Sequence, residues 1–571
     1  MCVTRAICLL VLATVAAASQ DARPLVTVES GSLRGLKQRS LSGRYYAAFK
    51  GIPYAEPPVG ALRFEPPQLH RPWTGERDAS AHGNNCLQYS MMHNFSKLGQ
   101  EDCLFLNVYS PRLPESKEEK GLPVMVWVHG GGFISGSGDD DIFGVDYLLD
   151  EDVVVVTFNY RLGVFGFITT EDGFATGNLG LRDQALALQW VRDNIAAFGG
   201  DPELVTIFGE SAGGASVSLL VASPLTKGLF HRAISQSGSA SSCWCLAGDQ
   251  HEELAVLTTG LGCPESGAAA LECLRQKPAD DIMKVVASVG FDAGGLALQF
   301  HPRVDADAKE PFVPDQPNRL LKSGRFNRVP WMMGSTQDEG LFVAGFLHRD
   351  SEVLARALKG DLEAWSSASF LCGEGLSSKT VNGAPLEVAE KIRDFVLSKG
   401  GNPTAALIKF FSDRFFTLGM SAELSLASEL VPVYQYLVDH IGPGQMRFAD
   451  MIGVEAPPLP LVSHGDDMAY LFRAALQRRP EPGSPEYALV RLFVRLWTSF
   501  AQRGYPSAPE LGVEDWPIYT SQSGTYLRLN AAPALAEKFA EERVRFWESL
   551  PLKEPWNAQR WSSSKDGHDE L

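Results

Sequence analysis

The stretch Leu204-Val205-Thr206-Ile207-Phe208-Gly209-Glu210-Ser211-Ala212-Gly213 decides the fold prediction. Its first five residues are typical of a buried strand, and the residues from Ala215 to Leu220 suit a helix. A serine flanked by glycines between a strand and a helix predicts a sharp turn that exposes the Ser211 hydroxyl. The backbone N–H of Ala212 would then face an oxyanion formed beside that hydroxyl, so Ser211 is the candidate nucleophile.

A second glycine cluster, His129-Gly130-Gly131-Gly132, follows the apolar run Val124–Val128. Backbone without side chains can approach a substrate closely, and its N–H groups can face an anion. A flexible turn is the plain alternative, and a phosphate cradle is disfavoured because no Gly-Lys-Ser/Thr follows. Beside the serine turn, the cluster predicts Gly131 and Gly132 as the remaining oxyanion donors.

The wider pattern predicts an α/β protein. The apolar runs Val153–Thr157 and Val329–Met333 also predict buried strands, and Asp183–Ile195 has the apolar spacing of a helix. Strands that alternate with helices predict a large, mostly parallel central sheet flanked by helices. The region from about residue 402 onward is expected to be mostly helical, and no linker divides residues 19–561, so one domain is expected.

Composition excludes some classes of function. The chain has 571 residues, with 68 acidic against 51 basic side chains and a formal net charge of −17. A nucleic-acid or anionic-membrane partner would need a basic face, so both are disfavoured. The hydrophobic share of 45% excludes a wholly disordered chain. The sequence predicts neither a cofactor nor a metal site.

Both ends carry targeting patterns. Arg5 and the short apolar run Ala6–Ala18 predict that residues 1–18 are a secretory signal peptide. Residues 562–571 predict a polar tether that ends in His568-Asp569-Glu570-Leu571, a retrieval signal read by a receptor of the endoplasmic reticulum. No second apolar run is long enough for a transmembrane span. The expected location is the lumen of the endoplasmic reticulum.

The cysteines fit an oxidising compartment. Cys86 and Cys103 could close one modest loop, and Cys263 and Cys273 a shorter one. Each bridge would stabilise the fold by about 3 kcal/mol on the loop-closure estimate. The sequence leaves the state of three further cysteines open: Cys243, Cys245 and Cys372.

Three longer motifs carry a family resemblance. They are Gly51-Ile52-Pro53-Tyr54-Ala55-Glu56-Pro57-Pro58, Glu101-Asp102-Cys103-Leu104-Phe105-Leu106-Asn107-Val108-Tyr109, and Phe198-Gly199-Gly200-Asp201-Pro202 followed by the serine turn. Together they resemble the type-B carboxylesterase/cholinesterase family from about residue 25 to about residue 555. The resemblance implies the α/β-hydrolase fold and ester hydrolysis, and the ends make the chain most like a carboxylesterase retained in the endoplasmic reticulum.

The same resemblance selects the base. In the α/β-hydrolase order the catalytic histidine follows the serine and the acid. His464 lies in Ser463-His464-Gly465-Asp466-Asp467, and the family places its catalytic histidine in this setting. Asp467 stands where relatives often carry Glu. The other histidines after Ser211 are His231, His251, His301, His348, His440 and His568.

The acid has two candidates. The strand Val329–Met333 is followed by a turn that contains Asp338 and Glu339, and either carboxylate could orient the imidazole. Residue chemistry alone leaves them nearly equal. The family places its catalytic Glu directly before Gly340, so the resemblance favours Glu339, and Asp338 is then expected to be a solvated loop charge.

Further positions are implied by the resemblance. Glu210 is expected beside the active site, with a satisfied buried acid as the alternative. The segment Gln236-Ser237-Gly238-Ser239 resembles one that lies just behind the catalytic residues in relatives, with Ser237 as the matching serine. Trp244 lies where some relatives place an aromatic of the acyl pocket, although a core role is equally compatible with its sequence context.

The Cys86–Cys103 loop bears on specificity. It contains the sequon Asn94-Phe95-Ser96, which predicts N-glycosylation at Asn94. It lacks the Trp by which cholinesterases hold a quaternary ammonium, so a hydrolase of neutral esters is favoured. A neutral-lipid or juvenile-hormone-like ester hydrolase is the alternative, although juvenile-hormone esterases usually carry Gln at the position of Glu210. A non-catalytic adhesion protein is disfavoured, and the physiological ester and oligomeric state stay open.

Overall fold

The computed structural model describes residues 23–93, 95–116, 119–170, 172–248, 250–290, 300–348, 356–362, 364–365, 386–398, 402–440, 442, 461–474 and 478–552. Several sequence predictions fall outside these ranges. They concern the signal peptide of residues 1–18, the tail of residues 562–571 with its retrieval signal, the glycosylation site Asn94, and Cys372.

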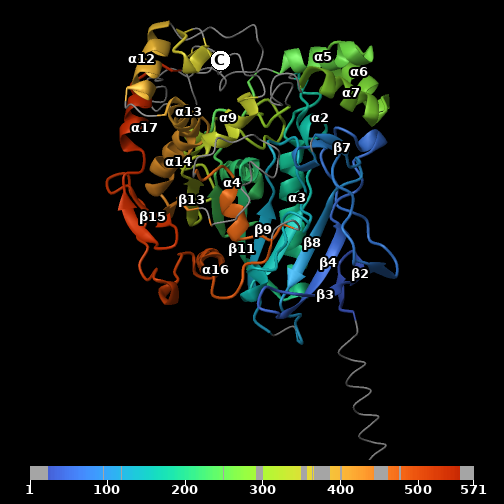
Figure 1. Cartoon of the computed structure of the whole chain (residues 1–571). Helices are drawn as coiled ribbons and strands as arrows, with labels where there is room; N and C mark the ends of the chain where they lie inside the picture. Colours follow the sequence, from blue (N-terminus) through green and yellow to red (C-terminus); the bar gives the residue numbers. More distant parts are fainter. Residues whose placement is uncertain are drawn as a thin grey trace, which may run out of the picture.

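An eleven-stranded mixed sheet runs through the protein (Figure 1). The strands from β15 through β14, β13, β12, β11 and β9 to β10 pair in parallel, and the outer strands β16, β8, β4 and β3 pair antiparallel. In chain order the strands are β3 (Leu36–Arg39), β4 (Tyr45–Pro53), β8 (Phe105–Ser110), β9 (Leu122–Val128), β10 (Val154–Phe158), β11 (Gly200–Glu210), β12 (Arg232–Gln236), β13 (Trp331–Thr336), β14 (Val433–Val438), β15 (Thr525–Leu529) and β16 (Ala534–Glu537).

Two smaller sheets lie near the N-terminal part of the chain. One contains β1 (Leu25–Val28), β2 (Gly31–Arg34) and β5 (Glu76–Asp78). The other is the hairpin of β6 (Gln88–Ser90) and β7 (Ser96–Leu98), which stands inside the Cys86–Cys103 loop.

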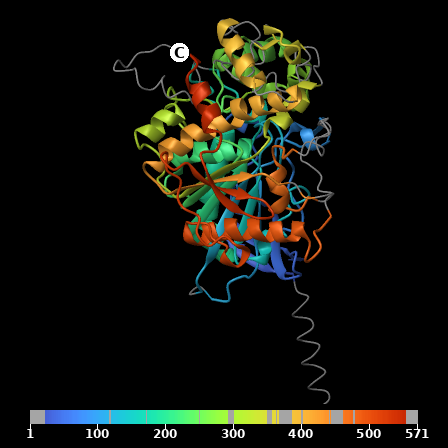
Figure 2. The ribbon, with the colours of Figure 1, turned by 60° about the vertical axis from the view of Figure 1, so that its left-hand side comes forward.

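Helices cover both faces of the central sheet because its strands are apolar on both sides. Along β9, Val124 and Val126 belong to one core, whereas Met125 and Trp127 belong to another, as the two-residue repeat of a strand requires. The first core packs on α3 (Leu179–Asn194) and α4 (Ala212–Ala222). The second packs on α16 (Pro485–Arg503), which Figure 2 shows running across the strands.

Several of the remaining helices gather at one end of the molecule in Figure 1. A third core joins several of them, including a π-helical turn, Asp413–Thr417, that links α13 to α14. None of the described helices is long and apolar enough to cross a bilayer. Besides α3, α4 and α16, the α-helices of the described ranges are α2 (Gly163–Phe167), α5 (His251–Leu261), α6 (Gly267–Gln276), α7 (Ala279–Gly290), α8 (Pro317–Lys322), α9 (Gly340–His348), α12 (Leu386–Leu397), α13 (Pro403–Ser412), α14 (Leu418–Ser428) and α17 (Glu541–Glu548).

The predicted α/β-hydrolase architecture is confirmed by the large sheet and its flanking helices. The four predicted apolar strands lie within or overlap β9, β10, β11 and β13, and the predicted helix overlaps α3. The expectation of a mostly helical region after residue 402 was wrong in one respect, because β14, β15 and β16 extend the sheet there. Their short apolar runs carry no periodicity that separates a buried strand from a buried helix.

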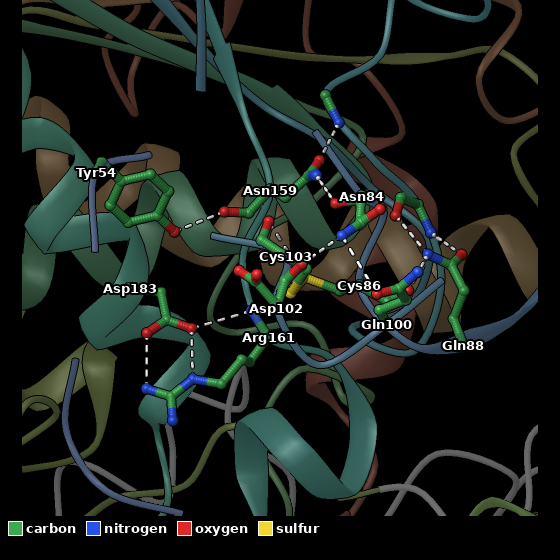
Figure 3. The surroundings of a disulfide bond; sticks show 12 residues. Tyr54, Asn84, Cys86, Gln88, Gln100, Asp102, Cys103, Asn159, Arg161 and Asp183 are labelled. Atoms are coloured by element: carbon green, nitrogen blue, oxygen red, sulfur yellow. Dashed lines mark hydrogen bonds and ion pairs between the residues drawn. A yellow bond between two sulfur atoms is a disulfide. The ribbon is translucent and has the colours of Figure 1, made fainter. Parts of the chain in front are cut away.

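The structure forms both disulfides that the spacing suggested, Cys86–Cys103 and Cys263–Cys273. Figure 3 shows Asn84, Gln88 and Gln100 around the first bridge, which ties the β6–β7 hairpin to the start of β8. Cys243 is also disulfide-bonded, and Cys245 is a buried free thiol.

Candidate active site

Ser211 occupies the tight turn between β11 and α4. Its backbone has φ 58° and ψ −124°, a conformation that few residues other than glycine adopt. Both glycines of the motif are needed for packing, since a Cβ at Gly209 would lie 2.6 Å from Val128 O and one at Gly213 only 2.0 Å from the same atom. The Ser211 N–H donates to Gln236 O at 2.9 Å, which fixes the turn against β12.

The glycine cluster after β9 lies alongside this turn. A Cβ at Gly130 would approach the Ser211 Cβ to 3.1 Å, so the loop passes directly over the serine. Gly131 and Gly132 have φ of 106° and 62°, which strongly favour glycine. The structure therefore brings the predicted oxyanion loop and the predicted nucleophile together.

Two further predicted residues meet in a buried contact. Nδ1 of His464 lies 2.6 Å from Oε2 of Glu339. The other carboxylate oxygen, Oε1, accepts hydrogen bonds from Thr336 N–H at 2.6 Å and from the Ser237 hydroxyl at 2.5 Å. All three donors hold the carboxylate in one orientation, so Glu339 can orient the imidazole and stabilise its charged form.

Asp338 is neither the carboxylate that contacts the imidazole nor a solvated loop charge, the two roles expected from the sequence. It is buried, not solvated, because it lies where the turn after β13 meets the segment before His464. Its Oδ2 accepts a hydrogen bond from Val462 N–H at 3.2 Å, and its Oδ1 lies 3.1 Å from Lys409 Nζ. Asp338 thus holds the segment that carries the histidine, whereas Glu339 is the carboxylate in contact with the imidazole Nδ1.

Glu210 approaches the opposite nitrogen of the same ring. Its Oε1 lies 3.2 Å from His464 Nε2, and both side chains are buried. Burial raises the pKa of Glu210 to about 8, although the charge of His464 opposes the rise. Burial alone would lower the pKa of His464, but the carboxylates of Glu210 and Glu339 outweigh it and raise the pKa to about 9.

The Ser211 hydroxyl forms no hydrogen bond with any described residue in this structure. Catalytic hydrogen bonds are often long or poorly aligned before substrate binds and tighten in the reacting complex. Transfer of the Ser211 proton to His464 therefore requires the hydroxyl to turn toward Nε2, a nitrogen that Glu210 contacts here.

A buried network behind the serine was missed by sequence reasoning. Gln236 donates through Nε2 to Asp467 Oδ2 at 2.8 Å and accepts through Oε1 from Trp497 Nε1 at 3.1 Å. Burial raises the pKa of Asp467 to about 6. Because the backbone carbonyl of Gln236 accepts the hydrogen bond from Ser211 N–H, this network helps to hold the turn that carries the serine.

Aromatic rings form a wall beside the histidine. The ring centroids of Phe416 and Phe342 lie 4.6 and 4.9 Å from that of His464. Trp244 continues the wall, with its centroid 6.3 Å from Phe416 and 6.4 Å from Phe133, the residue after the glycine loop. Its Nε1 donates to Phe415 O at 2.7 Å. The π-helical turn that presents Phe416 carries no sequence signal that could have located it.

The continuous helix from α13 to α14 contacts the turn of the acid, the histidine and the helix that follows the serine. Ser412 Oγ accepts from Gly340 N–H at 2.9 Å, directly after Glu339. Glu423 accepts hydrogen bonds from the hydroxyls of Ser218 and Ser241, at 2.9 and 3.0 Å. Ser218 lies on the helix that begins after the nucleophile, so one helix braces the acid turn and the serine helix together.

Within the described ranges, no group of three or more His, Cys, Asp or Glu side chains is placed to hold a metal ion. The arrangement brings together a strained serine, an imidazole between two carboxylates, and a glycine loop. Such a set suits nucleophilic attack on an acyl carbon.

The chain is similar to known esterases along most of its length. Residues 22–547 match the model of the carboxylesterase family. The chain is 36% identical to juvenile hormone esterase of Tribolium castaneum over 504 residues, which cover 85% of this chain and 84% of that protein. It is 32% identical to a carboxylic ester hydrolase of Bombus ignitus over 546 residues (93% and 95%), and 33% identical to carboxylesterase 1E of Mus musculus over 567 residues (95% and 96%).

Proposed function

Because the chain belongs to the carboxylesterase family and is a carboxylic ester hydrolase, we propose that it cleaves neutral esters with Ser211, His464 and Glu339 as its catalytic triad. The observation that carries this assignment is the buried 2.6 Å contact between His464 Nδ1 and Glu339 Oε2. Glu210, the residue directly before Ser211, contacts the other nitrogen of the same imidazole, and the strained turn at Ser211 is typical of a catalytic nucleophile.

The reaction would proceed through an acyl-enzyme. His464 Nε2 takes the proton of Ser211 as Oγ forms a bond to the ester carbonyl carbon, and the N–H groups of Gly131, Gly132 and Ala212 bind the oxyanion. Collapse of this intermediate breaks the bond to the alkoxy group, which leaves as an alcohol with the proton from His464. A water molecule, deprotonated by the same histidine, then releases the carboxylic acid and restores Ser211.

Neutral substrates are favoured over choline esters. The segment between Cys86 and Cys103 contains no Trp, so the cation–π contact that would hold a quaternary ammonium there is lacking. The aromatic wall of Trp244, Phe342 and Phe416 offers an apolar surface beside the histidine instead. We assign this wall to the acyl or alcohol group of the ester.

The experiment is a substrate panel with purified protein, in which short-chain methyl and aryl esters, glycerides and choline esters are compared by kcat/KM. We expect the neutral short-chain esters to be cleaved best and choline esters at least about tenfold less well, the order of one lost cation–π contact. Preferred turnover of choline esters would contradict the proposal.

A juvenile-hormone-like ester hydrolase is the second candidate, and the similarity to juvenile hormone esterase of Tribolium castaneum favours it. Glu210 argues against it, since such enzymes usually carry Gln at that position. A methyl ester of a long, branched, unsaturated acid separates the two candidates. A kcat/KM for this ester far above that for short-chain methyl esters would favour the second. Preference for long-chain glycerides would instead favour a neutral-lipid hydrolase.

For the location, we propose the lumen of the endoplasmic reticulum. The support comes from the signal-like residues 1–18 and from His568-Asp569-Glu570-Leu571. Deletion of the last four residues should send the protein into the medium of expressing cells. Glycosylation at Asn94 should make the retained protein sensitive to endoglycosidase H, and Asn94→Gln should abolish that mobility shift. Retention that survives the deletion would contradict the receptor's role.

A further inference from the structure

Gln88 is a buried amide whose hydrogen bonds go almost entirely to the loop after β9. Its Oε1 accepts from Gly136 N–H at 2.7 Å and from the Ser135 hydroxyl at 3.0 Å. Its Nε2 donates to Gly136 O at 2.8 Å and to Cys86 O at 3.0 Å. Only 2% of the residue is exposed, so water cannot reach the amide. The four protein hydrogen bonds therefore satisfy its polar atoms in place of water.

The bonded loop segment is the continuation of the oxyanion loop. Gly131 O accepts hydrogen bonds from Ile134 N–H at 3.1 Å and from Ser135 N–H at 2.9 Å, which closes a turn over Gly131 and Gly132. Packing at this turn is tight, because a Cβ at Gly131 would lie 2.1 Å from Ser135 O. A shift of Ser135 and Gly136 would therefore displace Gly131 and Gly132, the two glycines proposed to bind the oxyanion.

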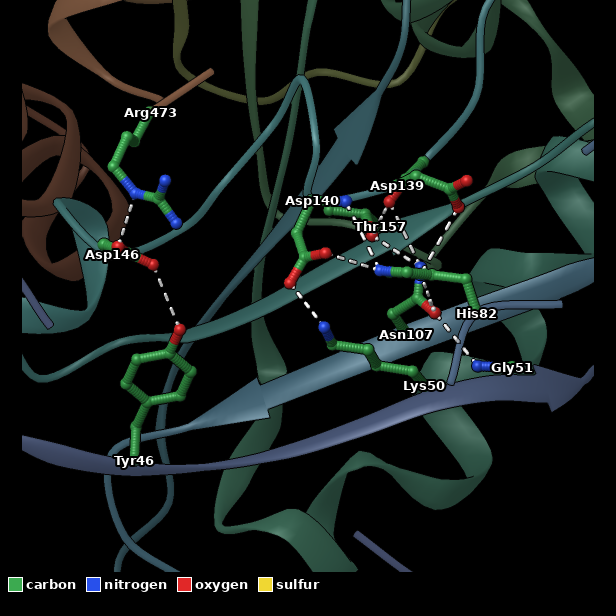
Figure 4. Close-up of polar contacts among 11 residues, drawn as sticks. Tyr46, Lys50, Gly51, His82, Asn107, Asp139, Asp140, Asp146, Thr157 and Arg473 are labelled. Atoms are coloured by element: carbon green, nitrogen blue, oxygen red, sulfur yellow. Dashed lines mark hydrogen bonds and ion pairs between the residues drawn. The ribbon is translucent and has the colours of Figure 1, made fainter. Parts of the chain in front are cut away.

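Other contacts fix the two ends of the loop. Within the turn, Met91 N–H also donates to Ser135 Oγ at 3.2 Å, whereas both the N–H and the carbonyl of Gly136 are bonded by Gln88. At the near end, the Tyr160 hydroxyl donates to His129 O at 2.9 Å. At the far end, Gly138 O accepts from Asn107 Nδ2 at 3.1 Å and from Thr157 Oγ1 at 2.6 Å. Figure 4 shows Asn107 and Thr157 in the polar cluster of His82, Asp140 and Lys50 that holds this end.

The disulfide loop in turn fixes Gln88. The residue begins β6, two positions after Cys86, and Figure 3 shows its side chain next to the Cys86–Cys103 bridge. The bond from Nε2 to Cys86 O links the amide to the bridged backbone itself. The chain of contacts thus runs from the disulfide through Gln88 to the turn that shapes the oxyanion loop.

We propose that Gln88 is a positioning residue, which holds the backbone of Gly131 and Gly132 in the geometry that binds the oxyanion. This inference rests on the proposed function of the site. Gln88 makes no contact with the reacting atoms, so it acts on transition-state binding only through the loop. A purely structural role would lower stability and leave the catalysis of each folded molecule unchanged.

The test replaces Gln88 by Glu, which keeps the shape of the side chain. An ionised carboxylate cannot donate to Gly136 O or Cys86 O, so two of the four hydrogen bonds become repulsive contacts. The matched control is Gln100→Glu, the same change in the same loop. Gln100 is exposed, and its side chain accepts a long hydrogen bond of 3.4 Å from Asn84 Nδ2. The substitution leaves its backbone hydrogen bonds with Leu87 and Asn85 in place.

Each variant is titrated with a fluorophosphonate, so that rates refer to reactive sites and not to total protein. We expect Gln88→Glu to lower kcat/KM per titrated site by about 30-fold, less than the loss of a whole oxyanion donor. The affinity for a trifluoromethyl ketone, which forms a tetrahedral adduct with the serine, should fall by the same factor. KM should change less than kcat, and Gln100→Glu should match the wild type.

If Gln88→Glu does not fold, the variant Ser135→Ala tests the same inference. It removes the hydrogen bond from the Ser135 hydroxyl to Gln88, together with the one that this hydroxyl accepts from Met91 N–H. It should lower kcat/KM and trifluoromethyl-ketone affinity together, by about threefold. A lower melting temperature with unchanged kcat/KM and ketone affinity, in either variant, would overturn the inference. Wild-type protein that takes up no fluorophosphonate would instead refute the proposed function.

Discussion

Glu210 Oε1 lies 3.2 Å from Nε2 of His464, on the nitrogen that does not contact Glu339. The imidazole therefore lies between two buried carboxylates, one at each ring nitrogen. Because a base must be unprotonated to accept the serine proton, this relationship sets the pH range in which the enzyme can work.

Glu210→Gln should extend activity to lower pH. The Glu210 carboxylate is one of the charges that raise the pKa of His464, so its removal lowers that pKa. The acidic limb of the kcat/KM profile should move down by about one pH unit. The plateau should also fall severalfold, since Glu210 stabilises the imidazolium formed in the transition state. Glu203→Gln is the control, because Glu203 is an exposed residue of the same strand. A limb that stays in place would contradict this account.

Ser211→Ala should abolish turnover while leaving the fold intact. The change removes only the hydroxyl, which no described residue bonds, and alanine adds no atoms to the crowded turn. Wild-type protein should take up one fluorophosphonate per chain and the variant none, with circular dichroism and melting temperature nearly unchanged. Ser116→Ala, at an exposed position, should label normally. Turnover of an activated ester by purified Ser211→Ala would refute the assignment of the nucleophile.

The two neighbouring acids should respond differently. Glu339→Gln removes the charge that faces His464 Nδ1 and should lower kcat by about 10⁴, as loss of a triad carboxylate does elsewhere. Asp338→Asn should keep kcat within about tenfold and lower the melting temperature, because Asp338 fastens Val462 and pairs with Lys409. The measurements are steady-state kinetics and thermal melts on both variants. A larger loss of kcat in Asp338→Asn than in Glu339→Gln would show that Asp338 is the catalytic acid.

Glu423 should make stability depend on pH. Burial raises the pKa of this carboxyl from its ordinary 4.5 to about 7, although hydrogen bonds from Ser218 and Ser241 oppose the rise. The folded state then binds the proton more tightly than the unfolded state. This contribution to stability is fully present below about pH 4.5 and is lost as pH rises through about 7.

Glu423→Gln should remove that dependence. The difference in melting temperature between wild type and variant should be largest near pH 5 and shrink toward pH 8. Glu429→Gln, exposed just beyond the same helix, serves as the control. A difference that is constant across this range, or that grows with pH, would show that Glu423 does not titrate in the folded protein.

Much of the candidate site could be predicted because its motifs are local. A strand, a glycine-flanked serine and a helix within one short stretch specify the turn at Ser211, since the geometry depends on neighbours in the chain. The same holds for the glycines after β9, where positive φ at Gly131 and Gly132 reflects a purely local requirement. The cysteine spacing likewise located the Cys86–Cys103 bridge.

Other features depend on contacts between distant segments. Asp338 and Glu339 are adjacent and chemically alike, and only packing against Val462 and Lys409 on one side and His464 on the other distinguishes them. The sequence by itself determined which residue types the site contains and the approximate positions of four central strands, β9, β10, β11 and β13. The tertiary structure alone decided which carboxylates face the imidazole, which amide holds the oxyanion loop, and that the sheet continues to β16, because burial, pairing and charge partners are properties of the folded neighbourhood and not of the local chain.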